Sequence, residues 1–355
     1  MISKNFISRV LVIIYITINL VYARFSPNRV GTTAANFLEL GYDPKGIAMG
    51  DAYVSIANSL SSIYWNPSGL SFMNKKEAFF SYQPWIVNTN TFFCAAGIPV
   101  KNVGTFAISL FGIDYGEMEV TTVELQDGTG ETFSPRDLAF TFSYGHLISS
   151  WFGFGATIKY INSSIYHCSA SAVAADFGVI IQTKFFSPTS DGKYGMKIGM
   201  SLSNYGSRMR YRGLDLLRSL DIAPDEAGNY KDVQVEFKTD SWELPLIFRI
   251  GFSLNPIVSA NQLLTLALDA IHPNNNSESI NVGVKYLIRL PGIADFIFRA
   301  GYRGLFMEDS VFGPTFGFGI LTHVNRGVSL RFDYAFRSIR VLGNSNAIGF
   351  SFLIN

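Results

Sequence analysis

The most constraining feature of this sequence is a two-residue alternation of apolar and polar side chains that recurs from residue 77 to the C-terminus. In residues 328–334, Val, Leu, Phe and Tyr alternate with Ser, Arg and Asp. Successive side chains of a β-strand point to opposite faces, so this pattern predicts a strand with one apolar and one polar face. About fourteen segments show it, near residues 77–83, 91–98, 103–113, 136–147, 152–165, 169–185, 194–204, 245–255, 262–270, 279–290, 295–303, 312–322, 326–336 and 346–354.

The length of these segments predicts that they cross a membrane. Many contain about 9–11 residues, which is what a tilted strand needs to span a bilayer. The chain is 48% hydrophobic and only 15% charged. Yet after the first twenty-odd residues no apolar run approaches the roughly 18–20 residues of a spanning helix. A sheet in lipid must close to leave no unpaired edge, so the sequence predicts an all-β transmembrane antiparallel barrel of about fourteen strands.

A large soluble two-sheet sandwich would alternate equally well. Two features favour the barrel. Tyrosines fall at strand ends, where an aromatic girdle meets the membrane interface. Charges also interrupt the polar faces in mid-strand, which suits a lumen. The candidate lumen-facing charges are Lys159, Asp176, Asp269, Lys285, Arg299, Arg331 and Asp333.

Loop lengths give an independent indication of orientation. The two longest connections, residues 114–135 and 205–244, are the third and the seventh, whereas most even-numbered connections are tight. Barrels of the outer membrane have long extracellular loops and short periplasmic turns. The odd-numbered connections are therefore expected to be extracellular.

The first residues are typical of an export signal. Lys4 and Arg9 precede a mostly apolar stretch, residues 10–20, and Val21-Tyr22-Ala23 places small residues where signal peptidase needs them. We expect residues 1–23 to be a cleaved signal peptide; a membrane-anchoring helix is the alternative. No cysteine follows the site, so a lipoprotein anchor is not expected.

Residues 31–71 do not alternate. They are rich in Gly, Ala and Ser, contain Pro44 and Pro67, and carry many apolar side chains that need burial. The lumen of a barrel of about fourteen strands is wide enough to hold them. We therefore expect residues 24–75 to form an N-terminal hatch and residues 76–355 to form the barrel. A disordered periplasmic tail is the alternative, and the aromatic content argues against it.

Six motifs follow one another from residue 31 onward: GTTAANFLELG, AMGDAYVSIAN, YWNPSGL, DGTGETFS, LDAIHPNNNSESINVGVKY and RAGYRGLFMEDS. With these motifs the chain resembles the PorV/PorQ family of outer-membrane barrels, which is related to the FadL long-chain fatty-acid transporters. The resemblance implies fourteen strands and an N-terminal hatch. It also implies that Asn66, Pro67 and Gly69, which follow Trp65, correspond to the Asn-Pro-Ala-type hatch motif, with Ser68 in place of alanine.

Several kinds of chemistry are not expected. The sequence has no catalytic, nucleotide-binding or metal-ligand motif, so we expect no enzyme, cofactor or metal; a barrel enzyme of the phospholipase or protease type is the alternative. A net charge of +1 gives no reason to expect nucleic acid. Cys94 and Cys168 could form a disulfide, although packed thiols are the commoner arrangement.

The resemblance leaves several functions open. The first is an accessory role in type IX secretion, in which the barrel associates with a translocon and its cargo proteins. The second is passive uptake of hydrophobic small molecules, as in FadL, and the third is a general porin. An apolar path through the lumen would favour transport. Paired charges crossing the lumen, such as Arg299 or Arg331 with Asp176 or Asp333, would favour a sealed scaffold.

Overall fold

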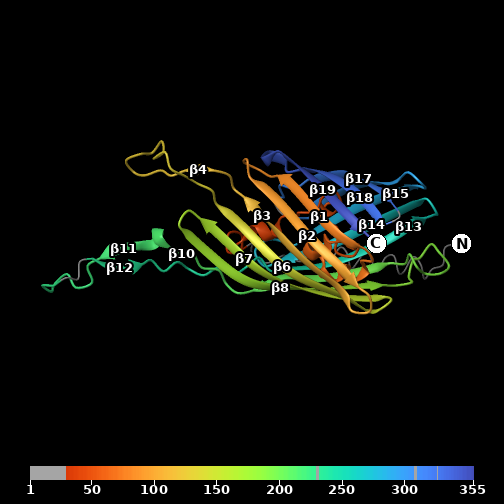
Figure 1. Ribbon diagram of the computed structural model, residues 1–355, viewed down its shortest axis with the longest axis horizontal. Helices are drawn as coiled ribbons and strands as arrows, with labels where there is room; N and C mark the ends of the chain where they lie inside the picture. Colours follow the sequence, from red (N-terminus) through yellow and green to blue (C-terminus); the bar gives the residue numbers. More distant parts are fainter. Residues whose placement is uncertain (1–28, 229–231, 308–309, 326) are drawn as a thin grey trace.

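The computed structural model describes residues 29–228, 232–307, 310–325 and 327–355 (Figure 1). Fourteen long antiparallel strands form one closed barrel, in which β1 pairs with β19 and β8 with β9. Their bounds are Lys76–Pro84 (β1), Asn90–Val100 (β2), Gly104–Asp114 (β3), Arg136–Ser149 (β6), Phe152–Ile165 (β7), Cys168–Gln182 (β8), Lys197–Gly206 (β9), Ile247–Val258 (β13), Gln262–Pro273 (β14), Ser279–Leu290 (β15), Ala294–Leu305 (β16), Pro314–Asn325 (β17), Val328–Ser338 (β18) and Asn344–Ile354 (β19). The predicted fold class is confirmed, and each predicted segment overlaps one of these strands. The expected signal peptide lies outside the described residues.

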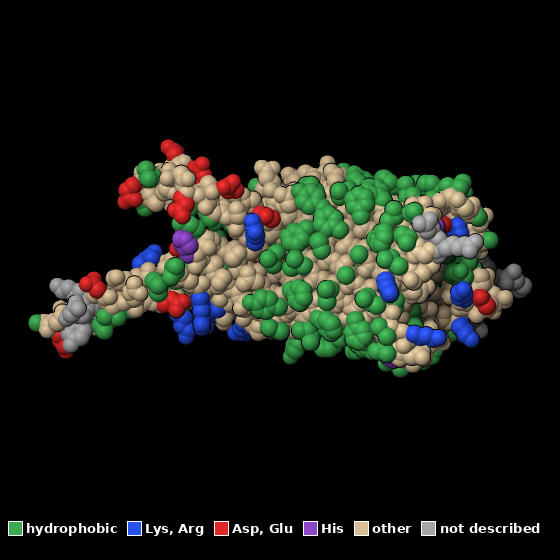
Figure 2. Space-filling view, in the orientation of Figure 1, with side chains coloured by type: hydrophobic (Ala, Val, Ile, Leu, Met, Phe, Trp, Pro, Cys, Tyr) green, Lys and Arg blue, Asp and Glu red, His purple; other side chains and the backbone are tan. Residues whose placement is uncertain are grey.

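The wall has two faces, as the alternation requires. In β1 the side chains of Glu77, Phe79, Ser81 and Gln83 are buried, and the residues between them are exposed. The outward positions of the barrel form an apolar belt, and charged side chains gather toward the two ends (Figure 2). Exposed apolar side chains of the wall include Phe80, Ile108, Phe140, Phe142, Ile158, Val173, Phe252, Leu268, Phe298, Phe316 and Phe350. An outer face of this kind matches a lipid environment.

The two long connections project from the same end of the barrel, which we call the long-loop end (Figure 1). The third connection contains the short strands β4 (Met118–Glu119) and β5 (Thr132–Phe133). The seventh contains β10 (Arg212–Gly213), η3 (Leu214–Leu216), β11 (Leu217–Leu220) and β12 (Val233–Glu236). A further short element, η4 (Arg340–Leu342), joins β18 to β19 at this end. The opposite end, the short-turn end, carries the tight connections.

The segment before β1 folds into four short helical pieces. They are η1 (Asn36–Glu39), α2 (Pro44–Ile47), α3 (Ser62–Trp65) and η2 (Pro67–Phe72). Every residue from 41 to 71 is buried except Asn58. Helices of four to six residues are not stable alone, so the surrounding wall must hold this segment in shape. We call residues 36–72 the hatch.

Two further observations complete the fold. Within the described ranges, no helix is both long enough and apolar enough to cross a membrane. Cys94 lies on β2 and Cys168 begins β8, and both thiols are free, so the two cysteines do not form the disulfide that the sequence left open.

Candidate functional site

The hatch packs against the inner wall so closely that many facing positions have room only for glycine. A Cβ on Gly199 would lie 2.6 Å from the carbonyl oxygen of Val54, and one on Gly145 would lie 2.7 Å from the backbone nitrogen of Ser71. Such distances are shorter than real Cβ contacts. The wall glycines that touch the hatch in this way are Gly97, Gly145, Gly153, Gly155, Gly178, Gly199, Gly283, Gly301 and Gly317.

This close packing explains why glycine recurs within several strands, which strand propensity does not explain. Glycine weakens a strand, and in Gly153-Phe154-Gly155 and Gly317-Phe318-Gly319 it recurs on one face of a strand, a sign of close backbone approach. Three of these four positions face hatch atoms, and a Cβ on the fourth, Gly319, would meet Asp333 and Arg299. Glycines at alternate positions on the inner face of a strand therefore indicate, in the sequence itself, where the hatch packs against the wall.

The Asn-Pro motif links two parts of the hatch to the wall. Asn66 is fully buried, and its Nδ2 donates to the carbonyl oxygens of Val54 at 3.0 Å and of Val179, on β8, at 3.1 Å. Its Oδ1 accepts from the backbone nitrogen of Ser68 and so caps η2, and Pro67 occupies the first turn of that helix. The serine that departs from the Asn-Pro-Ala pattern donates its hydroxyl to the same Oδ1, at 2.7 Å.

The other two motif residues, Gly69 and Trp65, contribute through close packing and not through an unusual backbone angle. Gly69 does not have a positive φ, so its backbone conformation does not require glycine. Instead, a Cβ on Gly69 would collide with the Ala57 carbonyl and the Ser62 hydroxyl. Trp65 is 2% exposed and packs edge-on against Tyr64, with ring centroids 4.8 Å apart. Its indole also covers Gly46, where a Cβ would have no room.

We expect Asn66→Ala to lower the free energy of unfolding by about 1–2 kcal/mol, because the helix cap and the two bonds to carbonyl oxygens are lost together. The measurement is thermal unfolding in detergent, followed by the gel mobility of the folded barrel. Asn58→Ala is the matched control, since Asn58 is an exposed residue of the hatch. An equal midpoint for the two variants would contradict this role of the motif.

Asp269, on β14, holds the middle of the hatch. Its Oδ2 accepts hydrogen bonds from the backbone nitrogens of Tyr53, at 2.7 Å, and Val54, at 2.9 Å. The carboxylate is fully buried. A predicted lumen-facing charge is therefore placed against the hatch backbone, and it lies beyond the reach of water rather than along a wet channel.

Asp51 makes a second connection, which the sequence did not single out. It lies in a tight turn in which Gly50 and Asp51 both have positive φ, 63° and 64°. Its carboxylate lies 2.8 Å from Arg303, on β16, and 2.7 Å from Arg337, on β18. The side chains of Asp51 and Arg337 are 5% and 1% exposed. A hatch carboxylate thus joins two wall arginines on strands that flank β17, on the long-loop side of the lumen.

Three more predicted charges meet at one place. Asp333 lies 3.0 Å from Arg299 and 2.7 Å from Arg331, and Arg299 and Asp333 are both 1% exposed as side chains. Lys285 faces Arg299 across the β15–β16 pair. Within the described part of the chain, the Lys285 ammonium forms no ion pair and no hydrogen bond. The structure therefore brings Arg299, Arg331 and Asp333 together and leaves Lys285 beside them.

The remaining two predicted charges pair with each other. Lys159, on β7, lies 2.8 Å from Asp176, on β8, and donates to Asn204 Oδ1 at 2.6 Å. The backbone nitrogen of Asn204 donates back to Asp176, at 2.7 Å. Asp176 thus pairs with a lysine of the next strand, not with the arginines proposed from the sequence.

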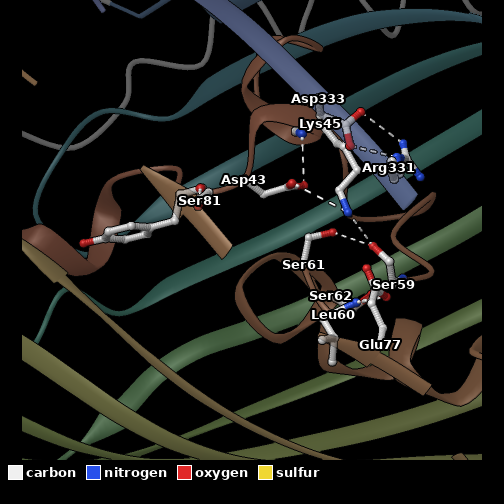
Figure 3. Close-up of polar contacts among 12 residues, drawn as sticks. Asp43, Lys45, Ser59, Leu60, Ser61, Ser62, Glu77, Ser81, Arg331 and Asp333 are labelled. Carbon is white, nitrogen blue, oxygen red and sulfur yellow. Dashed lines mark hydrogen bonds and ion pairs between the residues drawn. The ribbon is translucent and has the colours of Figure 1, made fainter. Parts of the chain in front are cut away.

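A buried polar network surrounds α2 (Figure 3). Lys45 is 0% exposed; its ammonium donates to Ser59 at 2.8 Å and lies 3.7 Å from Asp43. Nearby, the backbone nitrogen of Leu60 donates to Glu77 on β1, at 3.1 Å. Buried charges are tolerated only when they are paired and hydrogen-bonded, so this network fixes the hatch in one position.

At the long-loop end, one ion pair joins the seventh connection to the wall. His167 Nδ1 lies 3.0 Å from Asp215 Oδ1, beside the pairing of β10 with β8. This hydrogen bond lowers the pKa of the Asp215 carboxyl. Both side chains are well exposed to solvent, so the pair contributes little stability.

Comparison with known proteins places the chain. Residues 24–215, more than half of the sequence, match the family described as Type IX secretion system protein PorV. No curated protein matches the chain. Among solved structures, the fold is similar to the toluene transporter TbuX of Ralstonia pickettii, with a TM-score of 0.53 and 10% identity over 88% of this chain and 97% of that one. It is also similar to the toluene transporter TodX of P. putida, with a TM-score of 0.54 and 11% identity over 89% and 98%.

Identities this low show the fold alone, so the transporters establish the barrel architecture and not a substrate. The family match rests on the sequence itself, and it covers the hatch motif, whose contacts are described above, and the first seven long strands of the barrel. This chain is an outer-membrane β-barrel that belongs to the family of the type IX secretion system protein PorV.

Proposed function

We propose that this chain is an accessory of type IX protein secretion, which acts by binding other proteins and passes no solute through its lumen. In this proposal residues 1–23 direct export and are removed, residues 24–75 form the hatch domain, and the role is not enzymatic. The expected partners are a secretion translocon and its cargo proteins, with outer-membrane lipid around the wall.

The observation that carries the proposal is the ionic connection between hatch and wall. Asp51 bridges Arg303 and Arg337, and Asp269, on β14, accepts two hydrogen bonds from the hatch backbone. Breaking a buried ion pair by removing one partner has a large free-energy cost. Opening the lumen by moving the hatch away from these contacts would therefore be strongly unfavourable. Buried ion pairs that hold the hatch against the wall favour a sealed scaffold over an apolar transport path.

The long-loop end supplies a surface for partners. The extension formed by β11 and β12 projects away from the barrel (Figure 1). It carries well-exposed apolar side chains, among them Leu214, Leu220, Ile222 and Phe237. Clustered exposed apolar side chains on a projecting element are a common feature of protein interaction sites.

Affinity purification tests this proposal. The tagged chain is isolated from detergent-solubilised outer membranes, and co-purifying proteins and lipids are identified by mass spectrometry. A variant in which a Gly-Ser linker replaces residues 214–237 is the matched control. We expect a protein partner in stoichiometric amount with the full chain and a clear loss of it with the variant.

The alternative is FadL-like passive transport of hydrophobic small molecules. It predicts a bound apolar compound and no stoichiometric protein partner in the same purification. That result would overturn the secretion role.

A further inference from the structure

A small pocket lies between the hatch and the long-loop end of the wall. Its volume is about 110 Å³, and it is lined by the hatch and by strands β13 to β16 with their connections. Trp65 and Tyr64 come from the hatch, whereas Arg249 comes from β13 and Arg303 from β16. The hatch and the wall thus enclose a space that neither of them forms alone.

Two buried donors at this pocket lack partners. Arg249 is 4% exposed; its Nη1 donates to Ser203 at 3.1 Å, but its Nε has no hydrogen-bond partner among the described residues. Trp65 is 2% exposed, and its Nε1 has none within the same ranges. A buried N–H group without an acceptor is unfavourable, so these two groups call for an acceptor inside the pocket.

The carboxylates around the pocket are already engaged. Asp51 pairs with Arg303 and Arg337, and Glu39 accepts a hydrogen bond from Asn275. Asp269, which is not part of the lining, accepts from two backbone nitrogens of the hatch. None of these contacts uses the Arg249 and Trp65 donors. The Ser277 hydroxyl, which also lines the pocket and has no partner among the described residues, can either donate or accept.

We propose that this pocket binds a small carboxylate whose oxygens accept from Arg249 Nε and Trp65 Nε1. Size limits the ligand: a space of about 110 Å³ suits only a small molecule. Ile247, Ile271 and Met307 also line it and provide an apolar place for a short carbon end. A long-chain fatty acid does not fit. The inference does not rest on the proposed secretion role, because it uses only the pocket and its donors.

Ligand-observed saturation-transfer NMR on the full chain in detergent tests this site, with acetate as the probe and methylammonium as the probe of opposite charge. We expect an acetate signal and none from methylammonium. Arg249→Met should weaken acetate binding about ten-fold or more, because a hydrogen bond to a charged group is lost. Trp65→Phe, which removes the indole N–H without changing charge, should weaken it several-fold.

Arg289→Met is the matched control, since Arg289 is an exposed arginine at the short-turn end. It should bind acetate as the original chain does. The site would be ruled out by an acetate signal that persists unchanged in Arg249→Met and Trp65→Phe, or by no acetate signal in the original chain, which would mean that water alone fills the pocket. Because Trp65→Phe keeps every ionic contact, it decides the question even if Arg249→Met does not fold.

Discussion

Replacing Asp51 with alanine is expected to lower the free energy of unfolding by about 3–5 kcal/mol. The substitution leaves Arg337, 1% exposed, and Arg303, 17% exposed, without their shared carboxylate. Two unpaired guanidinium groups in the lumen must then draw water in or push the hatch aside. The measurement is thermal or urea unfolding in detergent, followed by the gel mobility of the folded barrel.

Two further variants test the cause of this effect. Asp127→Ala removes a carboxylate from an exposed long loop and should change the unfolding midpoint little. The double variant Asp51→Ala, Arg337→Met should recover part of the lost stability, because one of the unpaired charges is also removed. A double variant that is less stable by the sum of both single effects would show that the ion pair does not hold the hatch.

Gly301→Ala is expected to destabilise the protein by about 3 kcal/mol, the upper end of what overpacking costs. The new Cβ would collide with backbone atoms of Met49 and Gly50, and a backbone cannot move aside as a flexible side chain can. In a strand that does not oppose the hatch, the same substitution would stabilise by roughly 0.4–1 kcal/mol, through the unfolded chain. A decrease in stability on Gly301→Ala therefore indicates that the hatch packs against this strand, and an increase indicates that it does not. The change is measured as a shift of the unfolding midpoint.

Gly313→Ala provides the comparison. Gly313 has no positive φ, and a Cβ there would lie 3.6 Å from the nearest neighbour, in ordinary contact. We expect it to be neutral or slightly stabilising. If Gly301→Ala were equally harmless, the hatch would not press against β16 as described.

The barrel could be predicted because its signal is local and repeated. Each strand carries its own alternation, and the long connections after β3 and β9 indicate the orientation. The hatch motif was recognisable in the sequence, but its geometry was not. Helical pieces as short as η1 and α3 are too short to show a helical repeat of apolar residues in the sequence. Their shape also depends on contacts with wall strands that come later in the chain.

The ion-pair partners of the buried charges could not be predicted from the sequence, for a related reason. Asp51 and Arg337 are 286 residues apart, and the alternation tells which face a residue takes but not which residue it meets. The same limit applies to Asp176, which the sequence offered with an arginine as one example of a lumen-crossing pair and which pairs with Lys159. Lys159 and Asp176 lie on paired strands, in neighbouring register positions that only the fold reveals.

Ion conductance of the purified full chain in a planar lipid bilayer tests whether the hatch seals the barrel. We expect no steady conductance for the original chain and open-pore events for Asp51→Ala, in which the hatch loses its ionic connection to the wall. A steady conductance in the original chain, unchanged by Asp51→Ala, would mean that the lumen is open and that the hatch does not seal it.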